Sequence, residues 1–251
     1  MQTLQDERVV ITGGSRGLGL AMAEALVDRG AQVTVIARDR ARLAEMQRPG
    51  ISVRPGDATE AVLMDAVVAD VKPSVLILNA GATPVMAPLD EQAWDTFSVV
   101  WNTDVKAGLH GIQAALKAPL PHGSRVLIAS SGAASVGAPL SGGYAGAKRM
   151  LWFMAHDANA IAKERGLDIH FQVLVPLQMV GNTAIVQEVA GAYARRQGLS
   201  IEGFLAARYG GQALSARQYG EHVVTLLTDP SYATGVAYGV KSDIGITLLD
   251  G

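Results

Sequence analysis

The chain has 251 residues, of which 49% are hydrophobic, and this is enough for one α/β domain with a large core. Its formal net charge of -2 gives no electrostatic basis for binding nucleic acid, and the absence of cysteine excludes disulfides and thiolate chemistry. We find neither a signal peptide nor an apolar run of the roughly 20 residues that a membrane helix needs, so we expect a soluble, cytoplasmic protein.

Short apolar or β-branched segments alternate along the chain with segments of helical periodicity. Strands are predicted over residues 8–12, 33–37, 51–55, 75–78, 125–129, 169–175 and 235–239. Helices are predicted over residues 17–29, 40–47, 60–71, 96–117 and 144–165, and several more within 184–227, with breaks at Gly198 and at Gly210-Gly211. Strands without polar alternation, each followed by a helix, indicate a parallel sheet covered on both faces. The pattern predicts a single doubly wound α/β domain of about seven strands over residues 1–251.

A glycine-rich segment, T-G-G-S-R-G-L-G over residues 12–19, joins the first predicted strand to the first predicted helix. Its glycines allow a tight turn and let the backbone approach a pyrophosphate closely. The helix that follows offers free N–H groups and the positive end of its dipole to such an anion. The segment therefore predicts a dinucleotide site, and a glycine-rich turn in another kind of α/β protein is the alternative.

Tyr144 and Lys148 are four residues apart in a predicted helix and therefore share a helix face. Free tyrosine has a pKa of about 10, which is too high for easy proton exchange near neutral pH. A neighbouring ammonium favours the phenolate and lowers that pKa. Such pairs are usually structural, but this one follows a serine loop after the fifth strand. We therefore expect Tyr144 to exchange a proton with a carbonyl or alcohol oxygen.

Together these segments resemble the short-chain dehydrogenase/reductase family. The resemblance consists of the T-G-x3-G-x-G spacing, Gly56-Asp57, N-A-G at residues 79–81, Ser131, the Y-x-x-x-K of Tyr144 and Lys148, and the closing L-D-G at residues 249–251. The order and spacing of these marks cover almost the entire chain. The resemblance implies a Rossmann-type fold, a nicotinamide dinucleotide cofactor, and hydride transfer to or from a carbonyl or alcohol carbon.

The resemblance also implies roles for individual residues. Tyr144 gives or takes the proton, Lys148 bonds the nicotinamide ribose, and Ser131 stabilises charge on the substrate oxygen, with Ser130 as the alternative by register. The expected cofactor-binding residues are Gly13, Ser15, Arg16, Gly17, Leu18, Gly19, Arg38, Asp57, Asn79, Ala80, Gly81, Tyr144, Lys148 and Pro176. No metal site is expected.

Ala37-Arg38, at the end of the second strand, indicates which nicotinamide cofactor binds. A carboxylate there would accept hydrogen bonds from a free ribose 2′-OH, whereas a guanidinium pairs with a 2′-phosphate. Arg16 is a second candidate for the same phosphate. Asp39 is a complication, because it would favour NAD if it turned inward. We predict NADP (NADPH), with NAD as the alternative.

The sequence departs from the family pattern in two places. Aligned on residues 106–113, the family's relay asparagine falls on Asp104, which we count among the catalytic residues. Asn102, two residues earlier, points elsewhere on a regular helix, but a bulge could bring it in; Asp104 as a plain core-edge or capping residue is the other alternative. After the sixth strand, Leu177 replaces the family's glycine and Thr183 comes later than usual. We therefore expect a differently shaped nicotinamide pocket, with Val180 as a candidate wall.

Residues 181–212 correspond to the variable substrate lid of similar proteins. They contain the apolar side chains Ile185, Val186, Val189, Tyr193, Phe204, Leu205 and Tyr209, which indicate an apolar small-molecule substrate. NADPH-dependent ketone reduction is the leading hypothesis. NAD-dependent alcohol oxidation and a non-catalytic dinucleotide-binding sensor or partner subunit are the alternatives. A homodimer or homotetramer is implied by the resemblance only.

Overall fold

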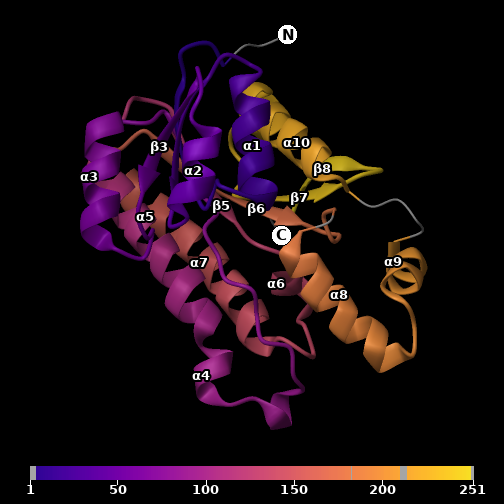
Figure 1. The fold of residues 1–251 in the computed structure, drawn as a ribbon. Helices are drawn as coiled ribbons and strands as arrows, with labels where there is room; N and C mark the ends of the chain where they lie inside the picture. Colours follow the sequence, from indigo (N-terminus) through magenta and orange to yellow (C-terminus); the bar gives the residue numbers. More distant parts are fainter. Residues whose placement is uncertain (1–3, 182, 210–213, 250–251) are drawn as a thin grey trace.

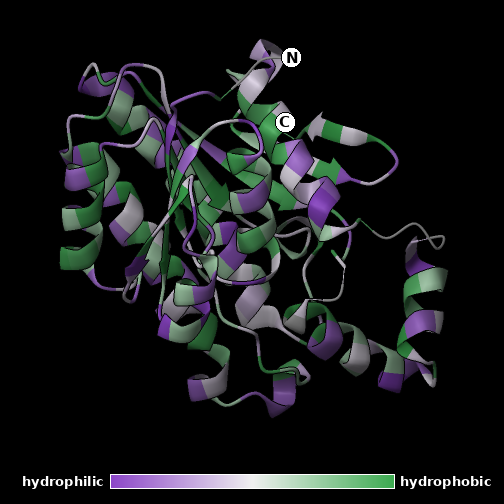
Figure 2. Ribbon diagram, turned by 45° about the horizontal axis from the view of Figure 1, so that its top comes forward, coloured by the Kyte–Doolittle hydropathy of each residue, from purple (hydrophilic) through white to green (hydrophobic). Residues whose placement is uncertain are grey.

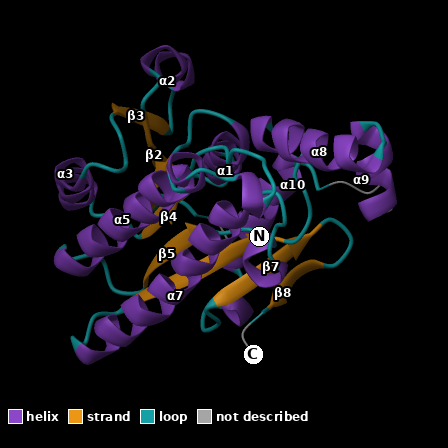
Figure 3. Ribbon diagram, turned by 90° about the horizontal axis from the view of Figure 1, so that it is seen from below, coloured by secondary structure: helices purple, strands orange, loops and turns teal. Residues whose placement is uncertain are grey.

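In the computed structural model, residues 4–181, 183–209 and 214–249 are described. Within them lies one eight-stranded sheet in the order β3-β2-β1-β4-β5-β6-β7-β8, with helices on both of its faces (Figures 1 and 3). Strands β1 to β7 are parallel, and β8 runs antiparallel to β7. The strand order reverses between β1 and β4, so the predicted Rossmann-type, doubly wound α/β fold is confirmed.

The elements follow the predicted alternation. The strands are β1 (Arg8–Thr12), β2 (Gln32–Ala37), β3 (Ile51–Pro55), β4 (Val75–Leu78), β5 (Ser124–Ala129), β6 (Ile169–Pro176), β7 (Ala237–Lys241) and β8 (Gly245–Leu248). The α-helices are α1 (Gly17–Val27), α2 (Arg40–Met46), α3 (Ala61–Val71), α4 (Trp94–Phe97), α5 (Lys106–Lys117), α6 (Ala133–Val136), α7 (Gly142–Glu164), α8 (Ala184–Gln197), α9 (Ile201–Tyr209) and α10 (Ala216–Thr228). Short 3-10 turns occupy Leu89–Glu91 and Pro230–Tyr232, and Trp101–Val105 form a π-helix.

The buried strands divide the core into two layers, one on each face of the sheet. Because successive side chains of a strand point to opposite faces, Val9 and Ile11 pack beneath α1, α2 and α10, whereas Val10 packs beneath α3, α5 and α7. Figure 2 shows the hydrophobic residues gathered along these central strands. Burial on both faces explains why the strands are continuous apolar runs instead of alternating patterns.

Two expectations about the elements were wrong. The single helix predicted over residues 96–117 is three elements: α4, the π-helix Trp101–Val105, and α5. The π-helix lies beside α7, where the Trp101 indole N–H donates to the Gly143 carbonyl at 2.9 Å. An eighth strand, β8, follows the last predicted strand, and its edge position and antiparallel direction come from pairing with β7.

Helices α8 and α9 project from the sheet (Figure 1) and share a small apolar core of their own, which includes Val186 and Phe204. Their predicted break at Gly198 is confirmed, since Gly198 ends α8 with a φ of +67°. The break predicted at Gly210-Gly211, and lid residues 182 and 210–212, lie outside the described residues. Among the residues that are described, none of the helices combines the length and apolar character that crossing a membrane requires.

Candidate active site

A large cavity lies where the parallel strands end. Its volume is about 1250 Å³, and its walls come from the segments that follow β1 to β6, together with α8 and α9. The carboxyl ends of parallel strands, at the point where the strand order reverses, are the usual ligand site of an open α/β sheet. The volume exceeds the roughly 300–1,000 Å³ of most small-molecule pockets. The cavity therefore has room for a cofactor and a substrate together.

The glycine-rich loop, residues 12–19, packs closely against the Asn79-Ala80-Gly81 segment and is hydrogen-bonded to it. Gly13 has a φ of +68°, and a Cβ on it would stand 2.7 Å from the Cα of Ala80. The Asn79 side chain donates to the carbonyls of Thr12 and Gly13, both at 3.2 Å. The Thr12 hydroxyl accepts from the backbone N–H groups of Asn79 and Ala80. Only glycine therefore fits at position 13 of this turn.

The first turn of α1 faces this cavity with its backbone donors available. Arg16 is the N-cap residue and makes no side-chain capping hydrogen bond. Ser15, Gly17, Leu18 and Gly19 line the cavity with Gly13. A helix N-terminus and a glycine turn that any Cβ would fill fit a pyrophosphate. These residues would hold the middle of a dinucleotide.

Charged side chains line the cavity where strands β2 and β3 end. Arg38 Nη1 lies 3.7 Å from Asp57 Oδ2, and Asp57 Oδ1 accepts from the Thr59 N–H at 2.9 Å. Burial raises the pKa of Asp57, but the hydrogen bonds from Thr59 and the charge of Arg38 outweigh it and hold this pKa below its usual value. Asp57 is therefore a carboxylate acceptor beside a guanidinium.

The Asp39 carboxylate contacts Arg42. Its Oδ1 accepts from the Arg42 N–H at 3.1 Å, which caps α2, and its Oδ2 lies 3.3 Å from Arg42 Nε. Arg16, Arg38 and Arg42 all line the cavity. The Asp39 carboxylate, which could have favoured NAD, therefore binds the first turn of α2 and the Arg42 side chain.

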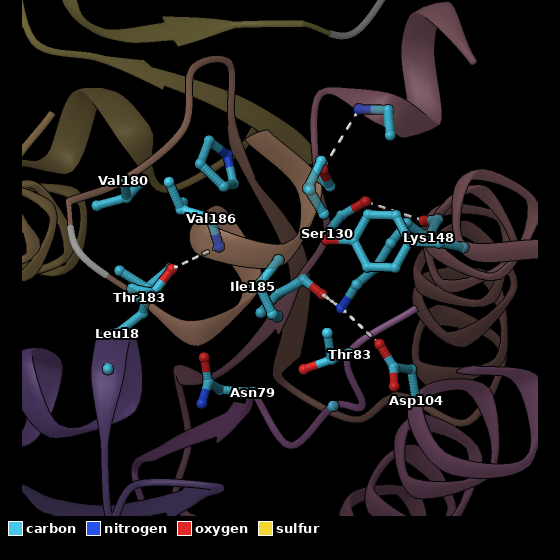
Figure 4. A pocket seen from close by; sticks show the side chains of 18 of the residues that line it. Leu18, Asn79, Thr83, Asp104, Ser130, Lys148, Val180, Thr183, Ile185 and Val186 are labelled. Carbon is cyan, nitrogen blue, oxygen red and sulfur yellow. Dashed lines mark hydrogen bonds and ion pairs between the residues drawn. The ribbon is translucent and has the colours of Figure 1, made fainter. Parts of the chain in front are cut away.

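Helix α7 and the π-helix bring three of the predicted catalytic residues together, and Figure 4 shows two of them, Lys148 and Asp104, facing each other. Lys148 Nζ lies 3.0 Å from Asp104 Oδ2, donates to the Ala129 carbonyl at 3.1 Å, and stands 5.7 Å from the centre of the Tyr144 ring. Asp104 Oδ1 accepts from the Ala82 N–H at 2.8 Å. Burial lowers the pKa of Lys148, but the negative charge of Asp104 and the Tyr144 phenol outweigh burial and raise it. Lys148 therefore stays an ammonium.

The two serines after β5 have different surroundings. The Ser130 hydroxyl is buried and donates to the Lys148 carbonyl at 2.9 Å. The Ser131 hydroxyl accepts a long hydrogen bond from the Ala133 N–H, at 3.3 Å, and Ser131 lines the cavity with its own proton still available. Of the two serines, Ser131 can therefore donate to a ligand, as its register in the family pattern implied.

The π-helix separates the two candidates for the relay position. Asp104 is buried against Lys148, whereas Asn102 is exposed and donates to the Ser98 hydroxyl at 3.4 Å. The bulge that could have brought Asn102 into the site is present, but it brings Asp104 there instead. The structure thus places a carboxylate beside the lysine.

The segment after β6 forms the wall opposite Lys148. Pro176, Val180 and Thr183 line the cavity, and in Figure 4 Val180, Thr183 and Leu18 lie across it from Lys148 and Asp104. The Thr183 hydroxyl accepts from the Val186 N–H at 3.3 Å and caps α8. Leu177 packs toward β7, since a Cβ on Gly239 would stand 2.6 Å from Leu177 Cδ1. A Cβ on Gly17 would stand 3.8 Å from Thr183 Cγ2, so Thr183 lies beside the phosphate loop despite its late position in the sequence.

The remaining walls of the cavity come from the predicted lid. Of its apolar residues, Ile185, Val186, Val189, Tyr193, Phe204 and Tyr209 line the cavity. Leu205 packs instead within the small core of α8 and α9. The Tyr193 hydroxyl accepts from the Leu140 N–H at 3.4 Å, which ties α8 to the loop before Tyr144. Among the described residues no cluster of side chains could hold a metal ion.

Sequence reasoning does not find two residues at this site, Trp101 and Tyr219. Trp101 anchors the π-helix to the residue before Tyr144, and Tyr219 is a buried tyrosine of α10 that lines the cavity. Trp101 and Tyr219 come near the site only because one helix packs on another, α7 beside the π-helix and α10 on α1. No local sequence motif marks such contacts.

The fold and this arrangement of residues define an oxidoreductase that uses a nicotinamide dinucleotide. A family model described as short chain dehydrogenase matches residues 7–191, and the chain belongs to that family. It is 28% identical to L-fucose dehydrogenase of Rattus norvegicus over 91% of this chain and 85% of that protein. It is also 28% identical to 2-(S)-hydroxypropyl-CoM dehydrogenase 3 of Xanthobacter autotrophicus, over 98% of each chain.

A third relative is cis-2,3-dihydrobiphenyl-2,3-diol dehydrogenase of Paraburkholderia xenovorans. It is 32% identical over 52% of this chain and 51% of its own length. The family and these relatives agree with the expectation from the sequence. The protein is an NAD(P)-dependent oxidoreductase that acts on the CH–OH group of a small molecule.

Proposed function

We propose that this protein is an NADPH-dependent carbonyl reductase, which also catalyses the reverse oxidation of the alcohol. Ser131, Tyr144, Lys148 and Asp104 are its catalytic residues. The observation that carries the proposal is that Tyr144, Lys148 and Ser131 line one cavity that the phosphate loop also lines.

The nicotinamide, when bound, supplies or accepts the hydride. The chain handles the proton: Tyr144 holds it on its phenol oxygen and gives it to the substrate oxygen during reduction. Lys148 faces Tyr144 as a fixed positive charge, because Asp104 and the Ala129 carbonyl hold its ammonium in place. The Ser131 hydroxyl donates to the substrate oxygen as negative charge develops there.

The charges at the adenosine end support NADP over NAD. Arg16, Arg38 and Arg42 line this end, and Asp39 is held by Arg42 and the first turn of α2. Guanidinium groups favour a 2′-phosphate, and the pairing of Asp39 with Arg42 offsets the negative charge that would oppose it.

The substrate end supports an apolar ligand. The acidic residues that line the cavity, Asp39, Asp57 and Asp104, are all near the cofactor loop or Lys148, and α8 and α9 contribute mainly apolar side chains. We propose that residues 181–212 cover the substrate as a lid of a single domain, residues 1–251. The Tyr193 contact to the Leu140 backbone supports this role.

We also propose that the protein is cytoplasmic and forms a homodimer or homotetramer. Exposed apolar side chains on α5 and α7, Leu109 at 41% and Phe153 at 51%, support an assembled state. Light scattering of the purified protein tests the assembly, and a monomer at micromolar concentration would contradict it.

The cofactor assignment is tested by measuring kcat/KM for NADPH and NADH with a panel of apolar ketones. The Arg38→Asp variant should lose about 10- to 150-fold in kcat/KM for NADPH, the value of a hydrogen bond to a charged group, and far less for NADH. Arg40→Asp is the matched control, because Arg40 is exposed and does not line the cavity. An equal loss for both cofactors, or for both variants, would contradict the proposal.

Oxidation of an alcohol with NAD is the second candidate, because the relatives named above are all called dehydrogenases. The same assay distinguishes the two. A wild-type protein that prefers NAD and NADH over the phosphorylated cofactors would favour this second candidate.

A further inference from the structure

A smaller pocket adjoins the cavity, and we call it the side pocket. Its volume is about 580 Å³, and it lies where the last turn of α9 meets the segment after β6 and the turn that follows β7. Four residues line both spaces: Leu177, Gln178, Arg208 and Tyr209. A ligand in the main cavity can therefore contact residues that also line the side pocket.

The order of the strands places the side pocket at the opposite end of the cavity from Arg38. Arg38 follows β2, whereas Lys241 ends β7, and the order β2-β1-β4-β5-β6-β7 puts five steps between these two strands. Neighbouring strands are about 4.8 Å apart, so the two residues lie roughly 24 Å from each other along the sheet. The side pocket is therefore remote from the expected adenosine end of the cofactor.

The catalytic residues lie between these two ends, near the side pocket. Ser131 follows β5, and the N–H of the residue after it donates to the carbonyl of Pro176, at the end of β6, at 3.0 Å. The N–H of Leu177 donates in turn to the carbonyl of Val240, the residue before Lys241, at 3.0 Å. Two steps of about 4.8 Å therefore separate Ser131 from the side pocket, roughly 10 Å in all.

Two cations, Arg208 and Lys241, line the side pocket. Arg208 Nε donates to the Tyr209 hydroxyl at 3.3 Å, and its two Nη groups make no hydrogen bond in the described part of the chain. Lys241 makes no side-chain hydrogen bond to a described residue either. Asp243, the acidic side chain that the structure shows in this pocket, forms an ion pair with neither cation. Both cations are therefore available to an anion.

The same face of α9 carries both an apolar and a charged contact. Phe204 and Arg208 are four residues apart, so they share a helix face, and both line the main cavity. The Phe204 ring stacks on Tyr193 with the ring centres 5.9 Å apart. A guanidinium pairs with a carboxylate through two parallel hydrogen bonds. This face therefore suits a ligand with an apolar body and a carboxylate at one end.

We propose that the side pocket binds the carboxylate of an oxo acid substrate, with Arg208 and Lys241 as the residues that hold it. The carboxylate would then lie roughly 10 Å from the ketone carbonyl at Ser131 and Tyr144, with an apolar chain between them. The inference rests on the proposed function and deepens it, because it names the class of ketone that is reduced.

The test compares oxo acids with their methyl esters, in a series with increasing chain length between ketone and carboxylate. NADPH oxidation gives kcat/KM for each pair in the wild type, Arg208→Gln and Lys241→Gln. The wild type should prefer the acid over its ester most where the chain spans roughly 10 Å. Each variant should lower kcat/KM for that acid about 5- to 12-fold, between the values of an exposed ion pair and a hydrogen bond to a charged group. The value for the ester should stay unchanged.

Two further variants are controls. Arg196→Gln removes an exposed arginine of α8 that lines neither space, so it should change kcat/KM for neither compound. Asp243→Asn removes the opposing charge from the side pocket, so it should raise kcat/KM for the acid. Damage to the lid could not produce such a gain. A lower or unchanged value for the acid in Asp243→Asn would count against the inference.

The outcomes separate this inference from the proposed function. Equal kcat/KM for acid and ester in the wild type, or an equal loss for both in Arg208→Gln, would overturn the inference and leave the proposed function intact. A loss of the same size in Arg196→Gln would do so too. A wild type that reduces neither series with NADPH would overturn the proposed function and this inference with it.

Discussion

Replacing Asp104 with asparagine removes one charge from a buried ion pair and keeps its shape. Asp104 Oδ2 and Lys148 Nζ are 3.0 Å apart, and the two side chains are 1% and 8% exposed. An asparagine still accepts from the Ala82 N–H through its Oδ1. Breaking a buried pair on one side destabilises a protein by about 3–5 kcal/mol, because the remaining charge is left desolvated. Lys148 keeps the Ala129 carbonyl, so we expect the lower end, about 3 kcal/mol at neutral pH.

The pH dependence of this loss follows from the pKa of Lys148. In the wild type this pKa is raised above 10.5, so the stability that the pair contributes is fully present below pH 10.5 and is lost as the pH rises through the folded-state pKa. In Asp104→Asn, burial acts without the opposing carboxylate and lowers the pKa of Lys148. Deprotonation at high pH then relieves the penalty. The difference in unfolding free energy between wild type and variant should therefore be largest near neutral pH and shrink toward pH 10.

Urea unfolding followed by circular dichroism, at neutral pH and near pH 9.5, measures this difference. Adding Lys148→Met to Asp104→Asn removes the stranded charge and should recover much of the lost stability. A loss below about 0.5 kcal/mol at neutral pH would place the variant within the range of ordinary surface substitutions and show that the ion pair does not stabilise the fold. The same loss at both pH values would refute the pH argument.

Three further variants test other parts of the site and fold. Ser131→Ala should lower kcat by about 10²-fold as an oxyanion donor is lost, whereas Ser130→Ala should mainly lower the unfolding free energy, by about 1 kcal/mol. Steady-state kinetics and urea unfolding measure both, and the opposite pattern would reverse the assignment. Gly19→Ala places a methyl against the Gly13 carbonyl, so NADPH binding should be lost in a fluorescence titration; an unchanged Kd would contradict the tight loop. Burial lowers the pKa of His222, so its contribution to stability is present above pH 6.5 and falls away below it; His222→Gln should flatten the decline of melting temperature on acidification, and an unaltered pH profile would contradict this.

Local patterns predict most of the sheet and the phosphate loop. Strands β1, β2, β4 and β6 are mainly apolar because both of their faces are buried, and a glycine turn before a helix has one local geometry that suits an anion. Ser131 could be told from Ser130 only by its register in a family pattern, and the structure supplies the physical reason in the Ser130 bond to Lys148.

Features that depend on contacts between distant elements could not be predicted. The π-helix depends on Trp101 meeting Gly143, so helical periodicity could not show whether Asp104 or Asn102 faces the site. Strand β8 is four residues long and is stabilised by pairing with β7. Tyr219 lies one turn into α10 and reaches the cavity only because α10 packs against α1.

In the proposed NADPH-dependent reduction, Tyr144 exchanges the proton with the substrate oxygen. The most direct test is kcat for NADPH oxidation, with the best ketone of the panel, in the wild type and in Tyr144→Phe. We expect turnover in the wild type and a loss of about 10²- to 10⁴-fold in the variant, the usual contribution of a positioned general acid. Undiminished turnover in Tyr144→Phe would contradict it.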